Sequence, residues 1–273
     1  MPQDQSGITS GTGVSFFGHD ASDAAPRAPE GVRYGVVNYI SPNPQLIAFI
    51  NNLNPIGFWM LDELGGTQAL DLSGNARHGT YQGTYTQNQP SLYGNGQFRS
   101  SILASPTGGV RIADTAALNL TSAGTLIAWV DVEASTPSFG TAIGKVKFNG
   151  GFEHGYILFY QNTVGMGVQP SLNAYDSYVE TQLQSGLIAN DSGAHMIAAT
   201  WNGTSAKVFY DGNVVASTGA WAPPGNAAGT DLMLGRDTGD IVDTFLEGTQ
   251  QSSIIFNYAL SETDIANIYS LTV

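Results

Sequence analysis

Two acidic turns carry the side chains best suited to bind a metal ion. Asp71 and Asn75 share the turn DLSGN, and Asp237 and Asp240 share the turn RDTGD. Carboxylate and amide oxygens on loops are the ligands that calcium prefers, at about 2.3–2.6 Å. The alternative is an ordinary turn in which the acidic side chains bond to their own backbone and remain hydrated. These four residues are therefore a candidate calcium site, and the spacing is not that of an EF-hand.

Tyrosines form a second candidate site, a surface for binding sugars. Tyr156, Tyr160, Tyr175 and Tyr178 lie in or near predicted strands and loops, and we expect them to be exposed. Sugar rings stack on aromatic faces, while neighbouring Asn and Asp groups hydrogen-bond to hydroxyls. Tyrosine is also enriched in protein–protein interfaces, so the same residues fit either kind of partner.

Only one pair of carboxylates is placed for catalysis on a predicted strand. Asp131 and Glu133 alternate onto the same face, with Cα atoms about 6.6 Å apart. Retaining glycosidases place two carboxyl groups about 5–5.5 Å apart. The pair is therefore a weak candidate, and the alternative is that these two residues are the polar end of a strand. The chain has no nucleophile elbow, phosphate loop or dinucleotide fingerprint. We therefore expect no enzymatic activity.

The four histidines do not form a metal-binding pair. None of them stands four residues from another, and we expect those at positions 78 and 195 to make structural hydrogen bonds. They are His19, His78, His154 and His195. The sequence requires no cofactor, and His19 with Asp20 and Asp23 forms either a cation site in the N-terminal segment or a solvated turn.

Charge and composition exclude several classes of partner. The 273 residues include 22 acidic and 9 basic side chains, a formal charge of −13, and no cysteine. Phosphate backbones and anionic membranes would be repelled, and disulfides and thiolate metal sites are excluded. Charged residues are only 11% of the chain, so its surface is covered mainly by Asn, Gln, Ser, Thr and Gly.

The elements that would position these side chains begin after an unusual N-terminal segment. Residues 1–54 are polar, rich in proline and poor in apolar residues, which predicts an extended arm lying on a partner subunit. A short helical pattern over 45–52 could anchor this arm. The first residues lack the pattern of a secretory signal, and Asn and Pro interrupt the most apolar window, 46–61, so we expect no membrane insertion.

From residue 55 onward the chain reads as an all-β domain. Short β-branched and aromatic runs alternate with Gly, Asn, Asp and Pro, as in sandwiches and barrels. Asp211-Gly212 predicts a tight hairpin, because both central residues of a type I′ turn need positive φ. Residues 261–271 predict a short C-terminal helix, capped by Ser261 with Asp264 three residues on. The clearest strands are expected at 125–133, 155–161, 195–201, 206–210, 231–235 and 251–256.

Several of these segments resemble, in order and spacing, the laminin-G-like, concanavalin A-like jelly-roll family. The matching stretches are 58–63 (FWMLDE), 65–67 (GGT), 71–75 (DLSGN), 78–80 (HGT), 124–130 (GTLIAWV), 195–203, 208–212 (VFYDG), 234–237 (LGRD), 245–248 (FLEG) and 257–261 (NYALS). The resemblance implies a two-sheet antiparallel jelly-roll sandwich over 55–273. Its tryptophans Trp59, Trp129 and Trp201 are expected to be buried. Related modules often hold calcium near a rim of the sandwich, and the family also includes glycoside hydrolases.

Three functions of different class follow from this resemblance. The first is a non-catalytic structural subunit of a larger assembly, similar to phage virion proteins that decorate a capsid or build a fibre. In that case the arm 1–54 docks on other subunits, the protein is oligomeric, and the jelly roll faces outward on the virion surface. The second is a glycan-binding adhesion module, assisted by calcium, that attaches to cell-surface glycans. The third, with the least support, is a glycoside hydrolase.

Overall fold

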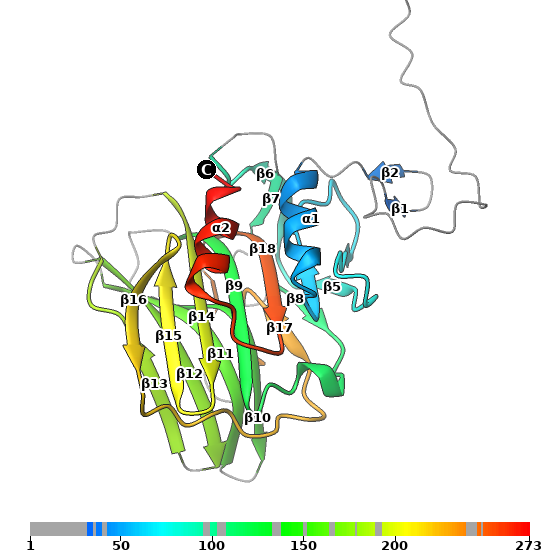
Figure 1. Cartoon of the computed structure of the whole chain (residues 1–273). Helices are drawn as coiled ribbons and strands as arrows, with labels where there is room; N and C mark the ends of the chain where they lie inside the picture. The colour runs from blue at the N-terminus through cyan, green and yellow to red at the C-terminus, as the bar shows by residue number, and fades with distance from the viewer. Residues whose placement is uncertain are drawn as a thin grey trace, which may run out of the picture. The chain divides into compact units, whose positions relative to one another are not determined.

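The computed structural model of the chain is shown in Figure 1, and its internal contacts divide the chain into two units, Met1–Ile40 and Ser41–Val273. The structure describes residues 32–34, 37–39, 43–94, 99–102, 108–132, 138–149, 152–163, 167–177, 179–188, 193–238, 245–246 and 248–273. In the first unit, strands β1 (Val32–Tyr34) and β2 (Val37–Tyr39) pair antiparallel. The second unit is the jelly roll.

Two antiparallel sheets form the jelly roll, and each has eight strands within the described part of the chain. The long-strand sheet has the order β13 (Val179–Gln184), β12 (Gly167–Ser177), β11 (Phe152–Thr163), β10 (Ser138–Asn149), β17 (Leu232–Leu234), β8 (Gly109–Ile112), β5 (Gly79–Gln82), β4 (Gln68–Ala69). The helix-covered sheet has the order β16 (Asn213–Thr218), β15 (Ser205–Tyr210), β14 (Ala194–Asn202), β9 (Ala123–Val132), β18 (Gly248–Phe256), β7 (Arg99–Ile102), β6 (Thr86–Pro90), and β3 (Gly57–Trp59) also pairs with β18. The predicted all-β, two-sheet architecture is confirmed.

The main core lies between the two sheets and is built from alternate residues of their strands. On β9, Leu126, Ala128 and Val130 point into this core, as the two-residue period of a strand requires. Trp59 and Trp201 are part of the same core. A short 3₁₀ helix, η1 (Ala116–Leu118), contributes Leu118 to it.

Trp129 is also buried, but in a second layer on the other face of the helix-covered sheet. Its ring packs edge-on against Tyr93 at a centroid distance of 5.3 Å, and its Nε1 donates to Oγ1 of Thr272 at 3.2 Å. All three tryptophans are at most 2% exposed, so the prediction that they are buried is confirmed.

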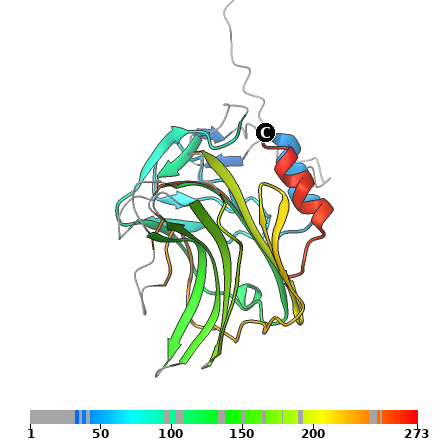
Figure 2. The same cartoon turned by 90° about the vertical axis from the view of Figure 1, so that its left-hand side faces the viewer.

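Helices α1 (Pro44–Asn52) and α2 (Glu262–Ser270) lie side by side along one side of the sandwich (Figure 2). Asn43 begins α1, because its Oδ1 accepts from the N–H of Leu46 at 2.8 Å. In α2, Ser261 and Asp264 form the capping box that the sequence predicts. None of the helices in the described residues is long and apolar enough to cross a membrane.

The helix expected near residues 45–52 is present, but it belongs to the jelly roll and not to the arm. Leu46, Ile47 and Ile50 are buried, and the side chain of Asn43 donates to the carbonyl oxygen of Leu271 at 3.0 Å. The compact unit accordingly begins at Ser41, about a dozen residues before the boundary expected at 54. Residues 1–31 lie outside the described residues.

The hairpin at Asp211-Gly212 joins β15 to β16, as predicted. The φ angles of these residues are 48° and 78°, which are the positive values that a tight turn of this kind needs. The side chain of Asp211 also accepts from the N–H of Met196 at 2.9 Å and contacts Nδ1 of His195 at 2.7 Å. The turn is thereby fastened to the neighbouring strand β14.

Candidate functional site

Strands β10 to β13 form a broad surface on the side of the long-strand sheet that faces away from the core. One row of directly opposed residues packs in or against the core, namely Ile143, Leu158, Leu172 and Leu183. Because side chains alternate along a strand, the adjacent rows point to the opposite side. We call these residues the outer face: Phe139, Thr141, Val146, Phe148, Glu153, Ile157, Phe159, Gln161, Ser171, Asn173, Tyr175, Glu180, Gln182 and Gln184.

One end of the outer face combines an accessible aromatic ring with side-chain amides. Phe139 is 51% exposed, and its ring lies 6.2 Å from that of buried Phe159. Phe139 is paired across the strands with Gln161, whose Oε1 accepts from Nε2 of Gln184 at 3.0 Å. An exposed ring backed by a second ring and flanked by paired amides can stack on a sugar and hydrogen-bond its hydroxyls.

The other end of the outer face is a polar group centred on Asn173, which is 4% exposed. Its Nδ2 donates to the hydroxyl of Tyr175 at 3.1 Å and to Oε1 of Glu180 at 2.7 Å. Its Oδ1 is buried without a hydrogen-bond partner among the described residues. Burial raises the pKa of Tyr175 to about 12, with further contributions from the charges of Glu180 and Glu153. The phenol therefore stays protonated at neutral pH and keeps its hydrogen for a donor bond.

Two of the tyrosines expected to be exposed are buried, which corrects the sugar-binding prediction for them. Tyr156 and Tyr160 are 1% and 2% exposed, because they share the inward row of β11 with Leu158. The hydroxyl of Tyr156 donates to the carbonyl oxygen of Leu118 at 2.9 Å, so no sugar can reach its ring. Tyr175 is half-buried on the outer face, and Tyr178 lies outside the described residues.

The first acidic turn is held by backbone hydrogen bonds. Oδ1 of Asp71 accepts from the N–H groups of Phe58 and Ser73, and its Oδ2 accepts from that of Arg77, at 2.8–3.1 Å. Asn75 donates through Nδ2 to the carbonyl oxygen of Pro55 at 3.1 Å. These are the contacts of an ordinary Asx turn, which the sequence left open as the alternative to a calcium site. They occupy both carboxylate oxygens of Asp71.

Of the two candidate ligands in the second acidic turn, the structure describes Asp237. Asp237 is buried beside β10, where a Cβ on Gly144 would stand 3.3 Å from the Cα of Asp237. Asp240 lies outside the described residues. Within the part of the chain that the structure describes, no three His, Asp or Glu side chains are grouped closely enough to hold a metal ion together.

The remaining candidates from the sequence have structural contacts or lie outside the described residues. Nδ1 of His78 accepts from the N–H of Asp71 at 3.1 Å, which is the structural role expected for it. His154 lies 3.2 Å from the carboxylate of Asp176. Glu133 and His19 lie outside the described residues, and so does the candidate carboxylate pair that Glu133 would form with Asp131.

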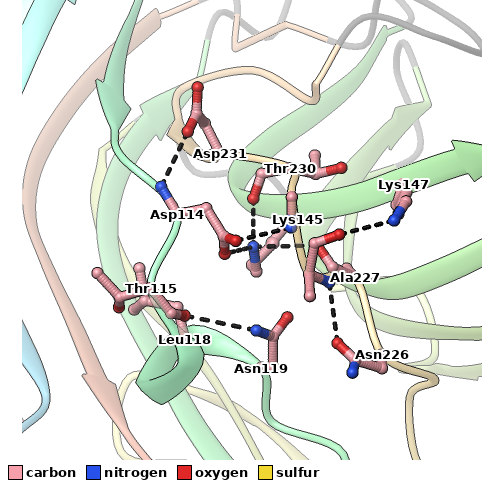
Figure 3. Close-up of polar contacts among 12 residues, drawn as sticks. Asp114, Thr115, Leu118, Asn119, Lys145, Lys147, Asn226, Ala227, Thr230 and Asp231 are labelled. Atoms are coloured by element: carbon pink, nitrogen blue, oxygen red, sulfur yellow. Dashed lines mark hydrogen bonds and ion pairs between the residues drawn. The ribbon is translucent and has the colours of Figure 1, made fainter.

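A buried ion pair that sequence reasoning missed fastens two loops to β10 (Figure 3). The side chain of Lys145 is fully buried, and its Nζ donates to Oδ1 of Asp114 at 2.7 Å, to the carbonyl oxygen of Ala227 at 3.3 Å and to that of Thr230. The other carboxylate oxygen of Asp114 accepts from the N–H of Gly229 at 2.7 Å. The ammonium group thus has three acceptors, and these bonds connect β10 to the loop of Asp114 and to the loop of Ala227 and Thr230.

Burial and pairing have opposite effects on these two groups. Burial lowers the pKa of Lys145, and the hydrogen bond and charge of Asp114 offset this only in part. Desolvation would raise the pKa of Asp114, but hydrogen bonds from Lys145 and Gly229 outweigh it, so this pKa is lowered. The signal available in the sequence was a lysine inside an apolar strand, AIGKVKF, where an unpaired charge would be costly.

Comparison with known proteins agrees with the fold. Residues 103–266, more than half of the chain, match the laminin G family model described as "Concanavalin A-like lectin/glucanases superfamily". No curated protein sequence matches the chain.

Several solved structures of botulinum neurotoxin domains share the fold. The serotype D binding domain has 15% sequence identity and a TM-score of 0.60, over 81% of this chain and 52% of that one. The serotype D ligand-binding domain in complex with N-acetylneuraminic acid has 13% identity and a TM-score of 0.57, over 83% and 52%. The receptor-binding domain of the C/D mosaic serotype has 13% identity and a TM-score of 0.56, over 81% and 52%.

The chain spans about half the length of these neurotoxin domains, and at such identities the likeness is one of fold. The family match covers strands of both sheets, including all of β10 to β13 that carry the outer face. Sequence family and architecture therefore agree with the resemblance seen in the motifs. This chain belongs to the laminin G family of the concanavalin A-like lectin/glucanase superfamily.

Proposed function

We propose that this protein is a non-catalytic glycan-binding module that binds oligosaccharides on its outer face. The observation that carries the proposal is the half-exposed ring of Phe139 next to the hydrogen-bonded amides of Gln161 and Gln184. Such a ring offers an apolar surface to sugar C–H groups, while amides both donate to and accept from hydroxyls. The polar group around Asn173 extends the same surface along the strands.

The comparisons support this proposal at the level of the superfamily. Its description includes lectins, and one of the structurally similar neurotoxin domains is described as bound to N-acetylneuraminic acid. Another is described in terms of an interaction with two ganglioside molecules. Since the similarity to these domains is one of fold, the position of a sugar on this chain has to come from its own residues.

Replacing Phe139 with alanine is expected to weaken glycan binding about two- to tenfold. Aromatic stacking contributes about 0.5–1.5 kcal/mol beyond buried area, and 1.4 kcal/mol corresponds to a factor of ten in Kd. A glycan array with neutral, amino-bearing and sialylated oligosaccharides identifies a binding sugar, and calorimetric titration then compares the two proteins. Because the ring is half-exposed, the melting temperature should stay close to that of the wild type.

The matched control is Leu64→Ala, which removes an exposed apolar side chain outside the outer face. This variant should bind as the wild type does. Equal affinity of Phe139→Ala and wild type for every bound glycan would place the site elsewhere, and an array without any bound glycan would refute the proposed function. Repeating the titration with calcium and with a chelator tests the calcium prediction for Asp71, Asn75, Asp237 and Asp240.

A second candidate function is that of a structural subunit in a larger assembly, such as a virion, with the jelly roll on its surface. The observation in its favour is that the chain divides after Ile40 into two units, of which the jelly roll is the second. A separate N-terminal unit can attach to partner subunits while the jelly roll remains accessible. This role is compatible with glycan binding, because a surface subunit can also be the part that contacts a cell.

Deleting residues 1–40 is expected to leave a folded jelly roll that no longer joins its assembly. The cut has to fall at 40, because a cut at 54 would also remove buried Leu46, Ile47 and Ile50 of α1. Size-exclusion chromatography with light scattering would compare the full chain with the truncated one. Identical assembly of the two proteins would contradict a docking role for this unit.

A further inference from the structure

The end of the outer face opposite Phe139 carries three carboxylates around Tyr175. Glu180 is paired directly with Tyr175 across β13 and β12, and Glu153 follows on the same face of β11. Asp237 lies against the same face, since a Cβ on Gly144, which is paired with Ile157, would stand 3.3 Å from the Cα of Asp237. Burial and the charge of Glu180 raise the pKa of Glu153. Negative charges therefore face one another across this end of the surface.

The hydrogen-bonding groups at this end mostly accept. Both bonds of the Asn173 amide nitrogen are used by Tyr175 and Glu180, and its Oδ1 is buried without a donor among the described residues. Carboxylates are acceptors only when they are ionised. A buried acceptor without a partner costs free energy, which a donating ligand group would recover. Acceptors therefore predominate at this end, and the hydroxyl and amino groups of a sugar can donate to them.

An apolar ring also lies at this end. Phe148 is 44% exposed and is directly opposed to Glu153. Arg236, the basic residue before Asp237, donates through Nε to the carbonyl oxygen of Asp237 at 3.3 Å. The combination of an aromatic ring, several acceptors and facing carboxylates suits the hydroxyl-rich face of an uncharged sugar or the ammonium group of an amino sugar.

We propose that the Asn173–Glu180 end of the outer face selects glycans that carry no acidic group and rejects sialylated ones. The inference rests on the proposed glycan-binding function and adds the class of sugar to it. A glycan carboxylate placed here would meet the like charges of Glu180 and Glu153. Like charges brought together in an interface are strongly unfavourable. The positions of Glu180 and Glu153 therefore disfavour a sialylated glycan relative to a neutral one.

The test is an array of matched pairs, in which each neutral oligosaccharide is printed beside the same oligosaccharide with a terminal N-acetylneuraminic acid. The full-length wild-type protein should bind the neutral member at least about tenfold more tightly. Glu180→Gln keeps an oxygen for Asn173 and removes the charge, and it should reduce this preference several-fold. High salt should reduce the preference in the wild type, because it screens exposed charges.

The control is Glu262→Gln, which removes one exposed carboxylate from helix α2 and changes the net charge equally. It should leave the preference unchanged; an equal effect of both variants would mean that the overall charge of −13 discriminates, and the inference would be wrong. Binding of sialylated members as tightly as neutral ones would overturn the inference and leave the proposed function intact. Binding of no glycan at all would overturn both.

Discussion

A Gly155→Ala variant should lose more than about 3 kcal/mol of unfolding free energy, or fail to fold. Gly155 lies on β11 with a φ of 122°, opposite Val146 of β10. A Cβ at this position would stand 1.9 Å from the carbonyl oxygen of Lys145, and a backbone atom cannot swing away as a side chain can. Relief therefore requires β10 and β11 to separate, which disrupts both the outer face and the buried ion pair.

Urea denaturation followed by tryptophan fluorescence would measure this loss, and thermal melting should fall by roughly 10 °C for a unit of this size. Gly186→Ala is the matched control. Gly186 follows β13 in the same sheet, it lacks a positive φ, and nothing lies within 4 Å of its added Cβ. The control should have the melting temperature of the wild type. If Gly155→Ala lowered the free energy of unfolding by less than about 1 kcal/mol, β10 and β11 could separate easily and the prediction would be wrong.

Replacing Lys145 with methionine should cost about 3 kcal/mol of unfolding free energy. The methionine fills a similar volume but removes the charge that faces Asp114 and the donors that Ala227 and Thr230 need. The expected result is early unfolding in urea together with faster proteolysis of the loop at 227–231. Lys207→Met is the control, because the exposed pair of Lys207 with Glu262 is worth about 1 kcal/mol or less.

The Lys145–Asp114 pair also makes the free energy of unfolding depend on pH, and the Lys145→Met variant should show less of this dependence. Because the pKa of Asp114 is lowered in the folded state, its contribution to stability is present above the ordinary aspartate value of 3.8 and is lost as the pH falls through the folded pKa. Unfolding curves of the wild type between pH 5 and pH 2 should reflect this, and those of Lys145→Met less so. If Lys145→Met and Lys207→Met lowered the free energy of unfolding equally, the buried pair would contribute no more to stability than the exposed pair, and the prediction would be wrong.

Features controlled by neighbouring residues could be predicted from the sequence. The type of turn at Asp211-Gly212 depends on positive φ at two adjacent residues, and the start of α2 depends on the reciprocal bonds of Ser261 and Asp264. Both are local, so the residue types were sufficient. The order of the family motifs supplied the two-sheet architecture, which single strands do not specify.

Features controlled by distant residues could not be predicted in the same way. The sequence shows that Tyr156 and Tyr160 lie on a strand, but the strand's two faces cannot be told apart until the partner strands are known. Lys145 gives no sign of its partner Asp114, which lies 31 residues earlier on another element. The surface beside Phe139 was missed because its amides come from separate strands that meet only in the folded sheet.

The contact between the residue before α1 and the residue after α2 brings the two ends of the jelly-roll unit together. Asn43 is bonded to the carbonyl oxygen of Leu271, two residues before the C-terminus of the chain. A unit whose ends nearly meet can be spliced into a surface loop of an unrelated host protein without stretching either junction. For the same reason a short linker between the two ends would allow new termini to be opened at an exposed turn, such as the one at Gly203, while the sandwich keeps its strand order.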